Sequence, residues 1–153
     1  MAEIRKSVLI EHRAEKMYAL VDGIEDYPAF LPWCGGAEIM DRTPDSVKAM
    51  LHISYHGIKA SFSTINENEP GRSIRMRLND GPFRKLDGEW RFLPLGDKAC
   101  KIEFMLVYEF SSTLLDKVLG PVFNHIANSF VEAFIQRADQ LAASSTPGLN
   151  NEN

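Results

Sequence analysis

The regular alternation of apolar and polar residues through the middle of the chain is the feature that most restricts its fold. A period of two places successive side chains on opposite faces of a β-strand. The pattern is clearest in the apolar members of two segments, Ile74, Met76 and Leu78 in the first and Ile102, Phe104, Leu106, Tyr108 and Phe110 in the second. Pro, Gly, Asn and Asp clusters separate six such segments, which predicts an antiparallel meander with one apolar face over residues 37–42, 47–55, 58–65, 73–79, 86–93 and 101–110.

A second pattern, at steps of three and four residues, predicts one long helix over residues 113–141. Its apolar stripe comprises Leu115, Leu119, Val122, Phe123, Ile126, Phe130, Phe134 and Ala138. This stripe has to lie on the apolar face of the sheet. We expect Gly120-Pro121 to kink the helix or to split off its first turn, because proline lacks the backbone donor.

The N-terminal part is predicted to contain a first strand over residues 4–10 and a helix over residues 14–21. A second short helix or turn is expected over residues 27–32. Pro28 suits a first helical turn there, and Pro32 would end it. The folded domain is expected to span residues 1–142. The polar, turn-rich segment 143–153 is predicted to be a disordered tail.

The hairpin around residues 80–84 has one pairing register that suits both faces of the sheet. On the inner face this register places Leu78 opposite Leu86 and Ile74 opposite Trp90. On the outer face, and on the following strand, it matches opposite charges: Arg77 with Asp87, Arg75 with Glu89, and Arg91 with Glu103. The cations left without an acidic partner in this region are then expected to be Arg72, Arg84 and Lys85.

Two runs carry a resemblance to known proteins, namely Tyr-Pro-x-Phe-Leu-Pro-Trp-Cys at 27–34 and Asp-Gly-Pro-Phe-x-x-Leu-x-Gly-x-Trp-x-Phe at 80–92. With the closing Ala-Phe-x-x-Arg-Ala at 133–138, the chain resembles the coenzyme Q-binding START-like proteins and the bacterial ribosome-association toxin family, over residues 4–141. These belong to the polyketide cyclase/dehydrase-like SRPBCC superfamily. The resemblance implies an α+β helix-grip fold. In that fold a curved antiparallel sheet of about seven strands wraps a long C-terminal helix, and two short helices follow the first strand.

The resemblance implies two different activities, and it brings no catalytic motif. The first is non-enzymatic binding of an isoprenoid quinone, ubiquinone above all, in support of respiration. Ubiquinone or a similar lipophile is then a bound ligand, and no cofactor is required. The second is binding to the large ribosomal subunit, which prevents the two subunits from joining. A cyclase or hydrolase on the same scaffold is a third option that rests on fold analogy alone.

A ligand between helix and sheet would contact side chains on the inner face of both. The residues predicted to bind it are Trp33, Phe62, Met76, Leu78, Phe83, Leu86, Trp90, Phe92, Phe104, Leu106, Tyr108, Phe123 and Phe130. Tyr108 is the expected polar handle in this apolar set, suited to a ligand with a carbonyl-bearing head. The same aromatics are also enough to fill an ordinary two-layer core, and both interpretations stay open.

Composition restricts the partners. A net charge of -4 argues against DNA binding driven by phosphate neutralisation. The basic residues around the hairpin suit either ribosomal RNA or anionic lipid headgroups. The N-terminus lacks the apolar run of a signal peptide, and no segment approaches the roughly 18 apolar residues of a spanning helix. We therefore expect a cytoplasmic protein, with peripheral contact at the inner membrane face as a second option.

Reactive groups are sparse. The two cysteines, Cys34 and Cys100, form no CxxC pair, so neither a disulfide framework nor a cysteine zinc site is predicted. His52 and His56 flank a turn rather than share a helix face, and no metal is assigned. Cys34 is expected to be a small buried hydrophobe rather than a nucleophile. No catalytic residue is assigned.

Overall fold

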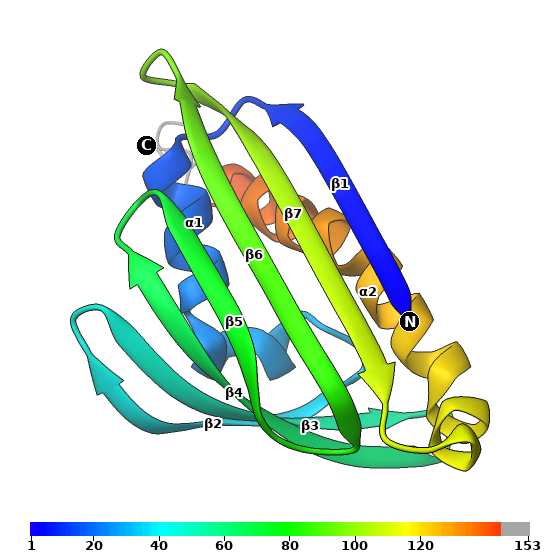
Figure 1. The fold of residues 1–153 in the computed structure, drawn as a ribbon. Helices are drawn as coiled ribbons and strands as arrows, with labels where there is room; N and C mark the ends of the chain where they lie inside the picture. The colour runs from blue at the N-terminus through cyan, green and yellow to red at the C-terminus, as the bar shows by residue number, and fades with distance from the viewer. Residues whose placement is uncertain (145–153) are drawn as a thin grey trace.

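A seven-stranded sheet curves around the C-terminal helix in the computed structural model, which describes residues 1–144 (Figure 1). The elements in chain order are β1 (Ala2–Ile10), α1 (Ala14–Asp22), the 3-10 helix η1 (Ile24–Ala29), β2 (Cys34–Thr43), β3 (Ser46–Tyr55), β4 (Ile58–Glu69), β5 (Ser73–Asp80), β6 (Phe83–Leu95), β7 (Ala99–Phe110) and α2 (Thr113–Ser144). The predicted helix-grip arrangement is confirmed.

The sheet is antiparallel throughout, in the order β1-β7-β6-β5-β4-β3-β2. Strands β2 to β7 form the predicted meander, and β1 returns to pair with β7 (Figure 1). The sheet therefore ends at β1 on one side and at β2 on the other. Helices α1 and α2 pack against each other, and both contact β6 or β7.

The inner face of the sheet and one stripe of α2 form a single core. Along β7, every second residue from Cys100 to Phe110 is buried, as the alternation predicts. Phe134 and Ala138 of α2 and Met17 of α1 are completely buried against this face. In the described part of the chain, none of the helices is both long enough and apolar enough to cross a membrane.

Several predicted boundaries differ from the observed ones. The 3-10 helix begins three residues earlier than expected and contains Pro28 in its last turn. Helix α2 runs through Gly120-Pro121 without interruption, so the predicted split of its first turn is wrong. It also continues to Ser144, two residues past the predicted domain end, while residues 145–153 of the expected tail lie outside the described residues. Strand β4 runs four residues beyond the predicted end, to Glu69.

The predicted hairpin register is largely confirmed. Strands β5 and β6 pair Ile74 with Trp90, Arg75 with Glu89 and Arg77 with Asp87, while Arg91 lies opposite Glu103 of β7. The ladder between β5 and β6 stops at Arg77, so the expected pairing of Leu78 with Leu86 is wrong. Leu78 is paired on the other side of β5, with Thr64 of β4. The alternation therefore predicted the register but not where the two strands separate.

Charge pairing on the outer face differs from the prediction. Arg77 binds Glu67 of β4, with 3.3 Å between Nη2 and Oε2. Arg84, which was expected to be free, binds Glu109 at 2.8 Å. Lys85 approaches Asp87 at 4.0 Å. The cations of this region that have no ion pair among residues 1–144 are Arg72, Arg75 and Arg91, and all three are exposed.

Candidate ligand-binding cavity

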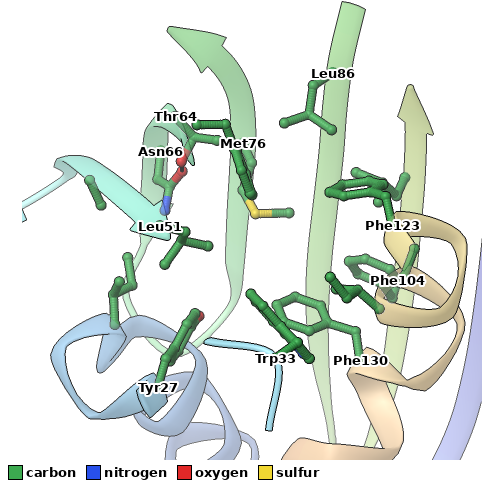
Figure 2. A pocket seen from close by; sticks show the side chains of 16 residues that line it. Tyr27, Trp33, Leu51, Thr64, Asn66, Met76, Leu86, Phe104, Phe123 and Phe130 are labelled. Carbon is green, nitrogen blue, oxygen red and sulfur yellow. Dashed lines mark hydrogen bonds between the residues drawn. The ribbon is translucent and has the colours of Figure 1, made fainter. Parts of the chain in front are cut away.

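A cavity of about 60 Å³ lies between α2, η1 and the inner face of the sheet (Figure 2). Its wall is almost wholly apolar and draws on both layers. The lining residues are Ile24, Tyr27, Trp33, Ala49, Leu51, Phe62, Thr64, Asn66, Met76, Leu86, Phe104, Leu106, Phe123, Ile126, Ala127 and Phe130. Strands β3 to β7 contribute nine of these side chains, so the curvature of the sheet forms most of the wall.

The structure brings eight of the thirteen predicted ligand-binding residues to this wall. They are Trp33, Phe62, Met76, Leu86, Phe104, Leu106, Phe123 and Phe130. That these side chains bind a ligand stays a prediction, but their convergence on one space follows from the alternation and from the stripe on α2. Figure 2 shows Trp33, Phe104, Phe123 and Phe130 along one side and Leu51, Thr64, Asn66 and Met76 along the other.

The other five predicted residues lie outside the cavity wall, and they are Leu78, Phe83, Trp90, Phe92 and Tyr108. Trp90 is completely buried behind the wall, with its ring 4.6 Å from that of Phe104 and 5.9 Å from that of Phe92. Phe83 packs between Phe110 and Phe123, with ring centroids 4.8 and 4.9 Å away. Trp90 and Phe83 therefore hold lining residues in place from behind, and Phe92 in turn stacks on Trp90.

Tyr108 does not supply the expected polar handle. Its hydroxyl group points toward Asn124 on α2, at 3.5 Å from Oδ1, and its ring packs on Phe123 at 4.7 Å. Burial raises the pKa of Tyr108, and the negative charge of Asp116 adds to this. The side chain therefore acts as a bridge between β7 and α2 at the far end of the helix.

Sequence reasoning missed eight lining residues, Ile24, Tyr27, Ala49, Leu51, Thr64, Asn66, Ile126 and Ala127. Tyr27 donates a hydrogen bond from its hydroxyl to the carbonyl of Val21, which ties η1 to α1. Burial raises the pKa of Tyr27 well above its ordinary value, and the charge of Asp22 contributes. A signal for Thr64 and Asn66 was present, since both share the strand face of Phe62 at steps of two.

Thr64 and Asn66 are the polar side chains of the wall on the sheet side. Thr64 is 9 % exposed and Asn66 5 %. The Thr64 hydroxyl donates to Oδ1 of Asn66 at 2.9 Å. Figure 2 shows the amide nitrogen of Asn66 directed away from Thr64, toward the space beside Leu51.

The cavity is too small for a tailed ligand as it stands, since pockets for drug-sized molecules occupy about 300–1,000 Å³. Trp33, however, lines both this cavity and a neighbouring cleft of about 270 Å³. The cleft lies between α2 and the loop before β2, and His125, Arg137 and Tyr55 are among its walls. The Trp33 indole thus separates two spaces whose combined volume reaches the lower end of that range.

The cavity wall offers no group for acid–base or nucleophilic chemistry near neutral pH. It contains no carboxylate, imidazole, thiol or amine, and its one titratable side chain, Tyr27, stays protonated. Cys34 is buried beside Trp33, and burial raises the pKa of its thiol. His52 binds Glu38 and Ser61 on the sheet surface, outside the cavity. No cluster of three metal-ligating side chains occurs among residues 1–144.

Comparison with known proteins adds a family. The model of the family described as "Polyketide cyclase / dehydrase and lipid transport" matches residues 10–135. The ribosome association toxin RatA of Escherichia coli (strain K12) is 42% identical over 141 residues, which cover 92% of this chain and 89% of that protein. Several other relatives at 39–42% identity are also toxins, and most of them carry the same name.

Two more distant similarities are to a coenzyme Q-binding protein, in sequence, and to a START superfamily protein, in structure. The mitochondrial coenzyme Q-binding protein COQ10 homolog B of Xenopus laevis is 24% identical over 143 residues, covering 91% of this chain and 59% of that protein. The solved structure of a START superfamily protein from Mycobacterium smegmatis has a TM-score of 0.72 at 23% identity, covering 91% of this chain and 98% of the other. The latter supports the fold alone.

Proposed function

Because this chain belongs to the polyketide cyclase / dehydrase and lipid transport family, we propose that it works by binding rather than catalysis, and that it associates with the ribosome. The observation that carries the proposal is the 42% identity, over 92% of the chain, to a ribosome association toxin. A cavity wall without carboxylate, imidazole, thiol or amine groups supports the absence of catalysis, because general acid–base chemistry needs a titratable group beside the substrate. We propose the large subunit as its target and impaired subunit joining as its effect.

The outer face of β5 and β6 is the part of the surface that best suits a ribosomal contact. Arg75 and Arg91 lie on this face, and the backbone amide of Phe92 donates to the carbonyl of Arg72 at 2.8 Å, which places Arg72 beside them. These three arginines have no ion pair in the described part of the chain. Exposed guanidinium groups of this kind are suited to phosphate oxygens of RNA.

Sucrose-gradient sedimentation tests the proposal directly. Purified protein added to separated subunits is expected to reduce the 70S peak and to sediment with the large subunit. The double variant Arg75→Glu/Arg91→Glu should weaken this effect, whereas Lys117→Glu, at an exposed position of α2, should not. An unchanged 70S peak at saturating wild-type protein would rule out ribosome association.

A second candidate function, binding of a lipophilic ligand such as ubiquinone, is favoured by the apolar wall of the cavity. The likeness to a coenzyme Q-binding protein adds to this, at 24% identity. No cofactor is needed, since burying an isoprenoid tail contributes about 25 cal/mol per Å². Entry requires Trp33 to move aside, so that cavity and cleft join. We place both activities in the cytoplasm, with peripheral contact at the inner membrane face during ligand exchange.

Solvent extraction of the purified protein followed by mass spectrometry tests the second function. A co-purifying isoprenoid quinone is the expected result. Titration with short-tailed ubiquinone should also quench the fluorescence of Trp33, which lies in the cavity wall. Absence of any extracted lipophile, together with unchanged fluorescence, would remove this function and leave ribosome association untouched.

A further inference from the structure

We propose that Asn66 is the residue that recognises the ligand's head group, by donating its side-chain amide hydrogens to a carbonyl oxygen. The proposal rests on the second proposed function, occupancy of the cavity by a lipophile. It defines the ligand class as a predominantly apolar molecule that carries at least one carbonyl oxygen, a description that quinones and long-chain ketones share.

The unpaired donor is the first observation. Asn66 is 95% buried, and its Oδ1 accepts the hydrogen bond from Thr64. No hydrogen bond joins its Nδ2 to another residue among residues 1–144, and Figure 2 shows this nitrogen directed away from Thr64, toward Leu51 of the cavity wall. An amide N–H without a partner in an apolar environment is unfavourable, so this position strongly favours an occupant that can accept a hydrogen bond.

Thr64 fixes the orientation of the amide. It lies two residues before Asn66 on the same face of β4, and its hydroxyl hydrogen is given to Oδ1. The amide is therefore held with its oxygen toward Thr64 and its nitrogen toward the open space. A ligand's carbonyl oxygen meets a donor that is already oriented, which reduces the entropy lost on binding.

The surroundings of Asn66 define the rest of the ligand. Leu51 and Met76 flank it on the wall, and the opposite side of the cavity consists of aromatic rings (Figure 2). A water molecule is the competing occupant, since the cavity has room for one and water also accepts hydrogen bonds. A buried water usually makes about three hydrogen bonds, however, and the sheet provides only Thr64 and Asn66 as polar side chains on this wall, so a water is held weakly there.

The test compares two probes that differ in one group, 2-undecanone and 2-methyl-1-undecene, in which CH₂ replaces the carbonyl oxygen. Their dissociation constants are measured by titration calorimetry for the wild type and for Thr64→Val/Asn66→Leu. The ratio of the ketone's Kd to the alkene's Kd should rise roughly three- to tenfold in the variant, the effect of one lost hydrogen bond. The double variant should fold, because replacing both hydrogen-bonded partners by apolar groups of similar shape costs little.

Asn128→Leu is the matched control. It makes the same chemical change on the exposed side of α2, outside the cavity wall, and should leave the ratio unchanged. A second measurement uses only the wild type: the side-chain ¹⁵N–¹H resonances of Asn66 should shift with the ketone and stay in place with the alkene.

The possible results distinguish carbonyl recognition by Asn66 from lipophile binding in the cavity. If the wild type binds both probes and the ratio is the same in the variant, Asn66 does not recognise the carbonyl, while lipophile binding stands. If the wild type binds neither probe, both are wrong. Unshifted Asn66 resonances with saturating ketone would mean that a water keeps the donor occupied, and the inference would fall.

Discussion

Gly88 offers a way to close the cavity from behind without touching the surface. It lies on the inner face of β6, with Met76 of β5 and Leu106 of β7 as its cross-strand partners, and both of these line the cavity. A Cβ atom added at Gly88 would lie 2.6 Å from Cε of Met76 and 3.1 Å from Cδ1 of Leu106. The end of the Met76 side chain then has to move, and the open space available to it is the cavity.

The cost of Gly88→Ala depends on whether Met76 moves. Burying the new methyl group contributes about 0.8 kcal/mol, and removing a glycine from a strand contributes about 0.5–1 kcal/mol. Overpacking against a fixed neighbour would cost about 1–3 kcal/mol, but methionine is flexible. The free energy of unfolding should therefore change by less than about 1 kcal/mol. A methyl group is about as large as a water molecule, so its displacement into the cavity of about 60 Å³ removes a substantial part of the space for a ligand.

The assay combines urea unfolding with titration of 2-undecanone. Gly88→Ala should keep its stability, bind the ketone roughly tenfold more weakly, and reduce the 70S peak as the wild type does. Adding Met76→Ala should restore the space and the affinity. The result that would refute this explanation is a loss of more than about 3 kcal/mol in the free energy of unfolding that Met76→Ala does not reverse. The new methyl group would then clash with the backbone carbonyl of Met105, at 3.3 Å, rather than with the flexible Met76 side chain.

Three further predictions concern entry, pH and salt. Trp33→Phe should raise the association rate constant of 2-undecanone severalfold in stopped-flow fluorescence, since a smaller ring opens the passage to the cleft; an unchanged rate would place the entrance elsewhere. Tyr27 has a raised pKa when folded, so it stays neutral while the unfolded chain ionises, and stability should fall above pH of about 10. Tyr27→Phe should make that alkaline slope shallower by up to about 1.4 kcal/mol per pH unit in urea unfolding, at a cost of about 1–3 kcal/mol for the lost hydrogen bond; equal slopes would contradict it. Ribosome binding through the three unpaired arginines should weaken with salt, and the logarithm of the association constant should fall against the logarithm of the salt concentration with a slope no steeper than about -3. In Arg75→Glu/Arg91→Glu the slope should be about -1. A steeper slope for the wild type would indicate a different contact surface.

The fold could be predicted because it follows from the periodicity of the apolar residues. The charge pairs could not be predicted, because they depend on which neighbouring strand each long side chain extends to. Alternation along residues 73–93 and 101–110 determined the register, which pairs Arg75 with Glu89 and Arg77 with Asp87. A residue in the middle of a sheet, however, has neighbours on two strands. Arg77 binds Glu67 on β4 instead of Asp87, its cross-strand partner on β6. The hairpin pattern contains only β5 and β6, so it cannot predict a partner on β4. Predicted free cations and observed ones therefore differ.

The aromatic part of the cavity was predicted from the sequence, and its polar part was missed. Apolar residues at the right period mark the inner face, so the pattern placed Phe104, Phe123 and Phe130 there, and the family resemblance implied a cavity beside them. Thr64 is polar and Asn66 lies beyond the predicted end of β4 at residue 65, so neither was counted among the apolar residues of the inner face. Tyr108 has the right period and a polar tip, but its distance along β7 places it beyond the cavity. Position along a strand, unlike the face it presents, depends on how the sheet curves.

The two proposed functions occupy opposite faces of the same two strands, and the period of two separates them. On β5, Arg75 faces outward and Met76 inward; on β6, Arg91 faces outward and Gly88 inward. Variants at inward and outward positions of the same strand therefore perturb different surfaces. Arg75→Glu/Arg91→Glu should leave ketone affinity unchanged, and Gly88→Ala should leave ribosome association unchanged. If either variant alters both ketone affinity and ribosome association, the two strands couple the cavity to the outer face. Bound ketone must then change the protein's affinity for the large subunit by the same factor by which the bound subunit changes its affinity for the ketone.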